Sequence, residues 1–173
     1  MPRLTSWEGA LGSYLESLRQ RAYSQETITT RRLTLHRFAR HLLRRRVLDV
    51  RRVSQAHISR YAHKLARAKT RYGRPCTILT QRTCLTIVRH FFAFLVKRKL
   101  ILCDPTQDLA LPRVHSLPRH VPTEAQARRL MSAPDKTRLG LRDRAMLELL
   151  YGSGLRASEL RRLDLTHLDL DKG

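Results

Sequence analysis

The feature that most constrains the fold is a series of four segments in the first 100 residues, each with apolar residues at helical spacing. The segments begin near residues 6, 25, 55 and 79 and end near residues 20, 45, 69 and 99. Each apolar face has to be buried against another element. The spacing therefore predicts an all-α fold, in which these four helices form a small bundle.

The expected core of the bundle follows from the same spacing. Its members are Trp7, Leu11, Tyr14, Leu15, Leu18, Ile28, Leu35, Phe38, Ala39, Leu42, Ile58, Tyr61, Leu65, Leu85, Val88, Phe91, Phe92 and Leu95. Thr5 and Glu8 have the spacing of a capping box, and Ser54 is a suitable N-cap between apolar Val53 and Ile58. We expect Trp7 to anchor the core instead of stacking on a nucleic-acid base.

The charge is strongly positive and uneven. The chain has 35 Lys and Arg against 14 Asp and Glu, a formal net charge of +21. Residues 1–110 hold 23 basic and 6 acidic side chains, whereas residues 111–173 hold 12 and 8. Such an excess favours a polyanionic partner, and the bundle is the part expected to bind nucleic acid.

The polar face of the second predicted helix is the main candidate for this contact. Arginines alternate there with short hydroxyl side chains: Arg31, Arg32, Arg37, Arg40 and Arg44 with Thr27, Thr30 and Thr34. Arginine binds phosphates and can bond to guanine edges in the major groove. A solvated charged face is the alternative, but few acids are present to balance it. Arg74, in the basic loop 70–75, is a further candidate.

Other classes of site have little support. Cys76, Cys84 and Cys103 show no metal-binding spacing, and an odd number argues against a disulfide framework. We predict no metal and no cofactor. The N-terminus lacks an apolar signal core and no apolar run reaches membrane-spanning length, so a soluble, cytoplasmic protein without a membrane partner is expected.

A second informative stretch, residues 141–163, predicts a helix, a break at Gly152-Ser153-Gly154 and a second helix beginning at Leu155-Arg156. The free N–H groups of a helix start suit anions, so a cation there is explained if an anion binds beside it. Glu159, three residues later, can orient the Arg156 guanidinium or accept from free backbone N–H groups. The alternative, a helical hairpin in which Arg156 and Glu159 form a solvated ion pair of little energetic value, is the one that spacing alone favours.

The letters around Arg156 closely resemble a known motif. Leu141-Arg142-Asp143-Arg144-Ala145-Met146-Leu147 and Tyr151-Gly152-Ser153-Gly154-Leu155-Arg156-Ala157-Ser158-Glu159-Leu160 are similar to the first catalytic box of tyrosine recombinases of the Xer and phage-integrase type. The resemblance implies that Arg156 binds the scissile phosphate and that Glu159 supports it. Residues 163–165 and 168–170 resemble the segment leading into the first strand of the family's catalytic domain.

The bundle in turn resembles the SAM-like core-binding domain of these enzymes, through its helix order and the segment from Leu85 to Phe92. The resemblance implies DNA contacts by Arg82, Thr86 and Arg89. It divides the chain into a DNA-binding domain (1–111), a proline-spaced linker (112–120) and the opening part of an α/β catalytic domain (121–173). Within the last part, Thr123 and Gln126 predict a capped helix to about Ser132. The implied partners are duplex DNA and other recombinase protomers on adjacent half-sites.

The family's transesterification also needs a Lys, a His-x-x-Arg motif, a second His or Trp and a nucleophilic Tyr, all downstream of the first Arg. The given sequence ends at Asp171-Lys172-Gly173, before the expected place of any of these motifs. His41-Leu42-Leu43-Arg44 and His57-Ile58-Ser59-Arg60 match His-x-x-Arg in residue type, but they lie upstream of Arg156. We expect this truncated recombinase to bind DNA without strand exchange. Two alternatives are a free-standing protein that occupies recombination sites and a basic helical protein that coats RNA or anionic membrane.

Overall fold

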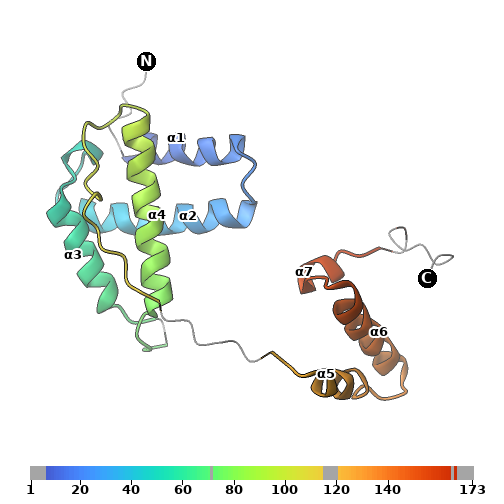
Figure 1. Ribbon diagram of the computed structural model, residues 1–173. Coiled ribbons are helices and arrows are strands. Elements are labelled where there is room, and N and C mark those ends of the chain that lie inside the picture. The colour runs from blue at the N-terminus through green and yellow to red at the C-terminus, as the bar shows by residue number, and fades with distance from the viewer. Residues whose placement is uncertain (1–6, 71, 115–120, 165, 167–173) are drawn as a thin grey trace. The chain divides into compact units, whose positions relative to one another are not determined.

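The structure is a computed structural model that describes residues 7–70, 72–114, 121–164 and 166. These residues form seven α-helices and one short 3-10 helix, with no strand among them (Figure 1). The prediction of an all-α chain is confirmed. The chain divides into two compact units, Met1–Ser116 and Leu117–Gly173. Each unit is described by itself below.

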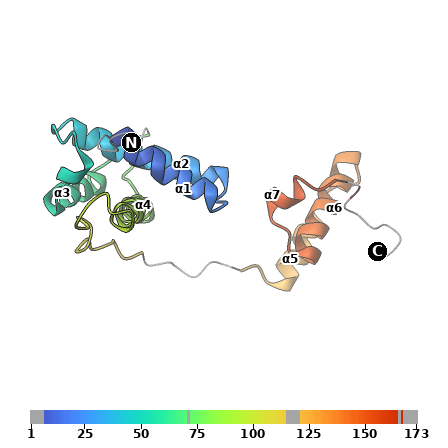
Figure 2. The same cartoon turned by 90° about the horizontal axis from the view of Figure 1, so that it is seen from above.

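The first unit contains the four expected helices. They are α1 (Trp7–Gln20), α2 (Gln25–Leu43), α3 (Gln55–Ala66) and α4 (Ile78–Lys97), with the 3-10 helix η1 (Val50–Arg52) before α3. The ribbons of α1 and α2 lie side by side, and α4 crosses both (Figures 1 and 2). Helix α3 packs on α2 and α4. Polar caps define the starts: Ser24 Oγ accepts from the N–H of Thr27 at 3.3 Å, and Thr77 Oγ1 accepts from Thr80 at 3.2 Å.

The predicted core is confirmed almost residue by residue. Every expected core side chain is buried except Leu65, which is half-buried against the core. Phe38 is the centre of an aromatic cluster, with ring centroids 5.8 Å from Trp7, 4.9 Å from Tyr61 and 6.0 Å from Phe92. The indole N–H of Trp7 donates to the carbonyl of Val47 at 3.0 Å, so the one polar atom of this side chain is satisfied. Trp7 is therefore a core anchor, as expected.

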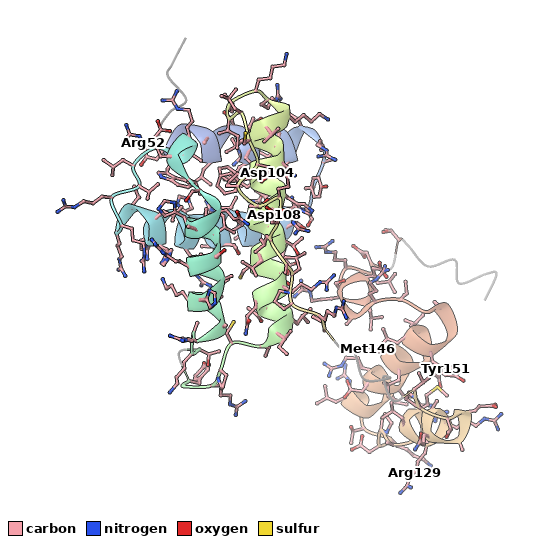
Figure 3. All side chains as sticks on the ribbon, turned by 60° about the vertical axis from the view of Figure 1, so that its left-hand side comes forward. Arg52, Asp104, Asp108, Arg129, Met146 and Tyr151 are labelled. Atoms are coloured by element: carbon pink, nitrogen blue, oxygen red, sulfur yellow. The ribbon has the colours of Figure 1, made fainter. Side chains whose placement is uncertain are left out.

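The chain after α4 folds back over the bundle. Ile101 and Thr106 are buried, and Asp104 Oδ1 accepts from the backbone N–H and the hydroxyl of Thr106 at 2.8 and 2.6 Å. Gln55 at the start of α3 donates to Asp108 at 3.3 Å. Asp104 and Asp108 are labelled on this segment in Figure 3. Residues 98–112 thus belong to the packed unit and do not leave it directly after α4.

The end of α3 differs from its predicted position. Helix α3 ends at Ala66, three residues before the predicted end. Residues 68–70 and 72–76 form a tight antiparallel turn, in which Lys69 pairs with Pro75 and the N–H of Cys76 donates to the carbonyl of Ala68 at 2.8 Å. Gly73 takes a positive φ of 76° at its tip. The turn competes successfully with the helix because these paired bonds satisfy the backbone.

The second unit holds α5 (Glu124–Met131), α6 (Arg138–Ser153) and α7 (Ala157–Leu160). The capping box of Thr123 and Gln126 is confirmed, with bonds of 2.9 and 3.3 Å. Thr137 caps α6, so this helix begins three residues earlier than expected. Gly140 is the only buried residue among those described in these helices, whereas Leu139, Leu141 and Tyr151 are exposed.

Several predictions fall outside the described residues. These are the Thr5 cap, most of the linker at residues 115–120, and the segments that include Leu165 and Leu168 to Leu170. No helix in the described ranges combines the length and the hydropathy needed to cross a bilayer.

Candidate nucleic-acid interface

The outward face of α2 carries the predicted arginine stripe. Arg32, Arg37, Arg40 and Arg44 are all exposed, and Glu26 in the first turn is the only acid in this helix. With no carboxylate in the later turns, this face presents uncompensated positive charge to solvent. Such a face attracts phosphates and releases counterions when they bind.

A groove between α2 and α4 brings three of the predicted contact residues together. Arg31, Arg82 and Thr86 line a cavity of about 430 Å³, with Thr27, Thr30 and His90 beside them. The Arg31 guanidinium donates to the Tyr14 hydroxyl at 2.7 Å and lies 5.0 Å from the centre of the Tyr23 ring. Arg31 is therefore fixed on the bundle, with only part of its donor capacity left for a ligand.

Arg82 and Arg89 make contacts that the sequence did not indicate. Arg82 donates to the carbonyl of Pro112 at 3.2 Å, and Arg89 donates to the carbonyl of Leu109. Both arginines thus hold the folded-back segment on α4. Their predicted contact with DNA stays a prediction, and in this structure they have a structural role.

The predicted exposure of Thr34 is wrong. Thr34 was expected on the exposed face of α2, but its side chain is buried, with 7% of its surface accessible. Thr34 precedes the core residue Leu35 and lies within hydrogen-bonding range of Cys84, so it belongs to the α2–α4 contact. A small side chain suits a helix crossing. Arg74, by contrast, is exposed in the turn after Gly73.

A second groove, between α2, α3 and the start of α4, has a volume of about 390 Å³. Five cations line it: Arg37, Arg40, Arg44, Lys64 and Lys69. No carboxylate is among its described lining residues. The two lysines were missed by the sequence analysis, although Lys64 follows the core residue Tyr61 by three positions and therefore lies beside the helix face that packs on α2.

His41, which lines the same groove, is 3% exposed and lies 5.3 Å from the Tyr61 ring between centroids. Its Nδ1 is 3.4 Å from a guanidinium nitrogen of Arg45. Among the described residues its Nε2 has no hydrogen-bond partner. Burial, followed by the nearby charges of Arg45 and Lys64, lowers the pKa of His41 to about 4, so the imidazole is neutral at physiological pH.

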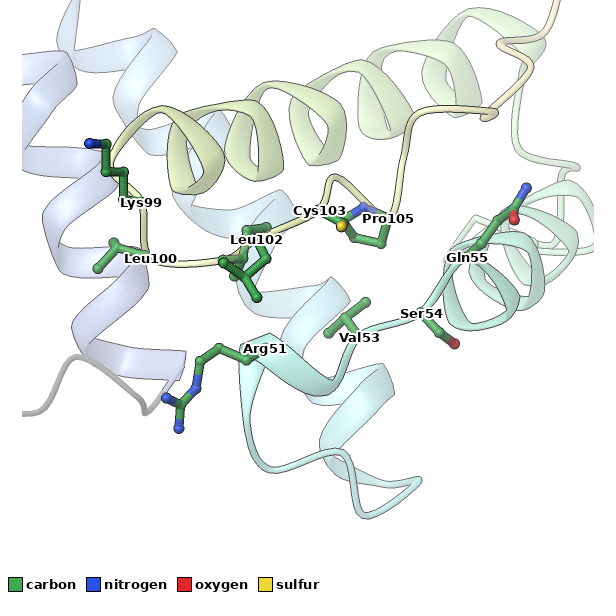
Figure 4. A pocket seen from close by; sticks show the side chains of 10 residues that line it. Arg51, Val53, Ser54, Gln55, Lys99, Leu100, Leu102, Cys103 and Pro105 are labelled. Atoms are coloured by element: carbon green, nitrogen blue, oxygen red, sulfur yellow. The ribbon is translucent and has the colours of Figure 1, made fainter.

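A third cavity, of about 570 Å³, separates residues 51–55 from residues 99–105 (Figure 4). Its cationic character is weaker, because the Arg51 guanidinium binds both carboxylate oxygens of Asp49 at 2.8 to 3.2 Å. In Figure 4 the Arg51 side chain points away from Val53 and Leu102. This cavity does not extend the basic face of α2.

In the second unit, Arg156 and Glu159 form the pair that the sequence predicts. Arg156 is the N-cap of α7; its backbone N–H donates to Glu159 Oε2 at 2.8 Å and its guanidinium donates to Oε1 at 2.9 Å. These two bonds, the backbone one first, hold the pKa of Glu159 below its usual range. Arg156 remains 82% exposed and keeps free donors for an anion.

The preceding turn differs slightly from the expected one. Gly152 and Ser153 continue α6, and only Gly154 breaks it, with φ of 63° and ψ of 21°. This left-handed conformation at a helix end suits glycine. The turn places Arg156 three residues after Ser153, the last residue of α6.

Comparison with known proteins identifies both units. The family model for the N-terminal SAM-like domain of phage integrases matches residues 11–99, and the model for the phage integrase family matches residues 121–173. The chain belongs to the phage integrase family of tyrosine recombinases. Its SAM-like match covers α2, α3 and α4 and therefore both basic grooves.

Two relatives illustrate the similarity. Tyrosine recombinase XerC 2 of Ralstonia nicotianae is 34% identical over 163 residues, which cover 91% of this chain and 46% of that protein. Tyrosine recombinase XerC of Escherichia coli O1:K1 / APEC is 40% identical over 92 residues, covering 51% of this chain and 30% of that protein. The chain thus matches less than half the length of these Xer-type relatives.

Proposed function

We propose that this chain binds double-stranded DNA as the N-terminal portion of a site-specific tyrosine recombinase that acts in DNA integration and recombination. The observation that carries the proposal is the uncompensated arginine face of α2, within the region matched by the SAM-like integrase domain. Residues 1–111 form the DNA-binding domain, residues 112–120 the linker, and residues 121–173 belong to the catalytic domain. The site of action is the cytoplasm.

The bundle binds the duplex through the exposed arginines of α2 and the groove between α2 and α4. Arg32 and Arg37 contact the phosphates or the guanine edges of the major groove, while Thr86 and Arg31 border the groove. Arg74 contacts the backbone from its turn. Arg82 and Arg89 reach DNA only if they release the carbonyls of Pro112 and Leu109.

Arg156 binds the scissile phosphate in this proposal, and Glu159 holds the guanidinium in place through the bond of 2.9 Å. A guanidinium stabilises the negative charge that develops on a transferring phosphoryl group. It supplies neither a nucleophile nor a proton for the leaving oxygen. We therefore expect a polypeptide of residues 1–173 to bind DNA without cutting it.

Selection from a randomised duplex library, with heparin as competitor and at several salt concentrations, tests DNA binding. The expected result is enrichment of a short half-site, with affinity reduced by Arg32→Ala and Arg37→Ala. Arg19→Ala is the matched control, because Arg19 lies on α1, is paired with Glu16 at 2.8 Å and lines neither groove. No enrichment, or equal binding to unrelated polyanions, would contradict the proposal and favour a general polyanion-coating protein.

A nicked suicide substrate tests the second part. Residues 1–173 are expected to give no covalent protein–DNA adduct, even at a half-site that they bind tightly. Adduct formation would show that the expectation of no catalysis is wrong. Specific binding without an adduct is also the behaviour of the alternative, a free-standing protein that occupies recombination sites.

A further inference from the structure

Arg31 differs from the exposed arginines of α2, because its guanidinium is already in contact with two tyrosines. Arg32 and Arg37 are exposed, whereas Arg31 is half-buried and lines the groove between α2 and α4. Its guanidinium donates to the Tyr14 hydroxyl at 2.7 Å and lies over the Tyr23 ring, 5.0 Å from the ring centre. We propose that Tyr14 and Tyr23 are positioning residues, which hold Arg31 in the orientation that reads a guanine in the major groove. The inference rests on the proposed function.

The Tyr14 hydroxyl is a fixed acceptor, because the ring that carries it is part of the core. The side chain is 3% exposed, and its ring packs edge-on against Phe91 and Phe94, with centroid distances of 5.5 and 5.3 Å. A buried polar atom needs a hydrogen-bond partner, and Arg31 supplies one from the next helix. This bond uses a single N–H of the guanidinium, so the other N–H groups remain for a ligand.

Tyr23 restrains the same guanidinium through its ring. The residue lies in the turn between α1 and α2, its N–H donates to the carbonyl of Leu18 at 3.1 Å, and its half-buried ring packs on the core. A cation is attracted to the face of an aromatic ring. The bond to Tyr14 fixes one N–H group of Arg31, while the Tyr23 ring limits how the guanidinium plane can turn about that bond.

A guanidinium restrained in this way suits a base edge better than a phosphate. Arginine recognises guanine through paired bonds to O6 and N7, for which the planar fork has to be aligned with the base. A phosphate offers oxygens in several directions, so an exposed arginine such as Arg32 can reach it in many side-chain conformations. Restraint before binding also lowers the conformational entropy that is lost in the complex. Arg31 is therefore the arginine of α2 that is best prepared for base recognition.

The first experiment compares Tyr14→Phe with wild type in selection from a randomised duplex library and in fluorescence anisotropy titrations. The phenyl ring keeps the packing on Phe91 and Phe94 and removes only the oxygen, so the circular dichroism spectrum should not change. A guanine preference at one position of the half-site should be lost. Affinity for the enriched site should fall roughly two- to tenfold, with no change for unrelated duplexes. An equal loss for all duplexes would assign Arg31 to a phosphate and overturn base reading.

A double variant separates positioning from a purely structural role of Tyr14. Arg31→Ala alone should remove the same guanine preference. In the Arg31→Ala background, Tyr14→Phe should change DNA affinity no further, because no guanidinium is left to position. Ser17→Ala is the matched control: it removes a hydroxyl from α1 that donates to the Tyr14 carbonyl at 2.6 Å and is not among the described residues of this groove. Additive losses in the double variant would show that Tyr14 acts only through the fold.

Tyr23 gives the converse test, because its ring and not its hydroxyl contacts Arg31. Tyr23→Leu should reduce the guanine preference, and Tyr23→Phe should rescue it. Without DNA, ¹⁵N relaxation of the Arg31 Nε–H should show greater mobility in Tyr14→Phe and Tyr23→Leu than in wild type. If wild type binds no DNA, the proposed function fails and this inference fails with it. If wild type selects a half-site and both variants keep its preference and affinity, only the positioning role is wrong.

Discussion

The two units of this chain use similar helices with very different packing. In the bundle, Phe38, Phe91 and Phe92 have no accessible surface, and an aromatic cluster joins α1, α2, α3 and α4. In residues 121–164, Gly140 alone is buried, and Leu130, Leu139 and Leu141 are more than half exposed. The comparison shows that helical spacing and good caps form helices, while a core requires enough elements to enclose it.

The largest expected difference between the two units follows from removing a large apolar side chain from each. Phe38→Ala should destabilise the bundle by about 3–5 kcal/mol, because it leaves a cavity among Trp7, Tyr61 and Phe92. Leu147→Ala in α6, which is half-buried, should change stability far less. Denaturant unfolding combined with hydrogen exchange measures both changes. Uniform exchange protection across the two units, or equal losses, would contradict the difference in packing.

The fold of the bundle was predictable because several independent features of the local sequence indicate the same helices and the same core. Apolar spacing, the N-cap Ser54 and the choice of Trp7 as an anchor all depend on local sequence and were confirmed. The end of α3 was not predictable, because Arg67-Ala68-Lys69 suits a helix and only the pairing of Lys69 with Pro75 decides against it. Long-range pairing overrides local preference at this position.

The candidate site was predictable in part for a similar reason. Residue type and spacing indicated the exposed arginines of α2 and the Arg156–Glu159 pair. They did not indicate that α4 covers Thr34, or that the folded-back segment offers its carbonyls to Arg82 and Arg89. Those contacts depend on which elements lie together in the fold, which no local pattern contains.

Acid should weaken the bundle more than the second unit. The pKa of His41 falls from 6.5 to about 4 on folding, so the unfolded chain takes up a proton at a higher pH than the folded one. The contribution of this group to stability is complete above pH 6.5 and is lost as the pH falls towards 4, by roughly 1–3 kcal/mol. Denaturation midpoints measured between pH 7 and pH 4 test the sign and the range.

The matched control for the acid effect is His41→Phe. The phenyl ring does not titrate, so the variant should show a flatter dependence of stability on pH than wild type. The lowered pKa of His90, caused mainly by burial, contributes with the same sign and should persist in the variant. A pH dependence identical to that of wild type would show that His41 is not the group responsible.

Removal of one helix cap in each unit tests the same difference in packing through a smaller change in stability. Thr77 caps α4 and Thr123 caps α5, through bonds of 3.2 and 3.3 Å. Each Thr→Ala change should weaken its helix by about 1 kcal/mol. In the bundle the loss should appear in the global unfolding transition, because α4 is part of the core. In α5 the loss should appear only in local hydrogen exchange. If both variants instead lowered the midpoint of the global unfolding transition, the two units would unfold together.

The smallest expected effect on stability is that of Glu159→Gln. The amide oxygen can still accept from the backbone N–H of Arg156, so α7 keeps its cap and the thermal transition should not move. The charged bond to the guanidinium is lost, and the Nε–H signal of Arg156 should show greater mobility in NMR relaxation. Glu159→Asp is the control, since its shorter side chain cannot make both bonds. Wild type should lose the same restraint only as the pH falls below the ordinary range of a glutamate, because the pKa of Glu159 is lowered and its carboxylate stays charged until then. An Arg156 that is equally ordered in all three proteins would show that Glu159 does not position it.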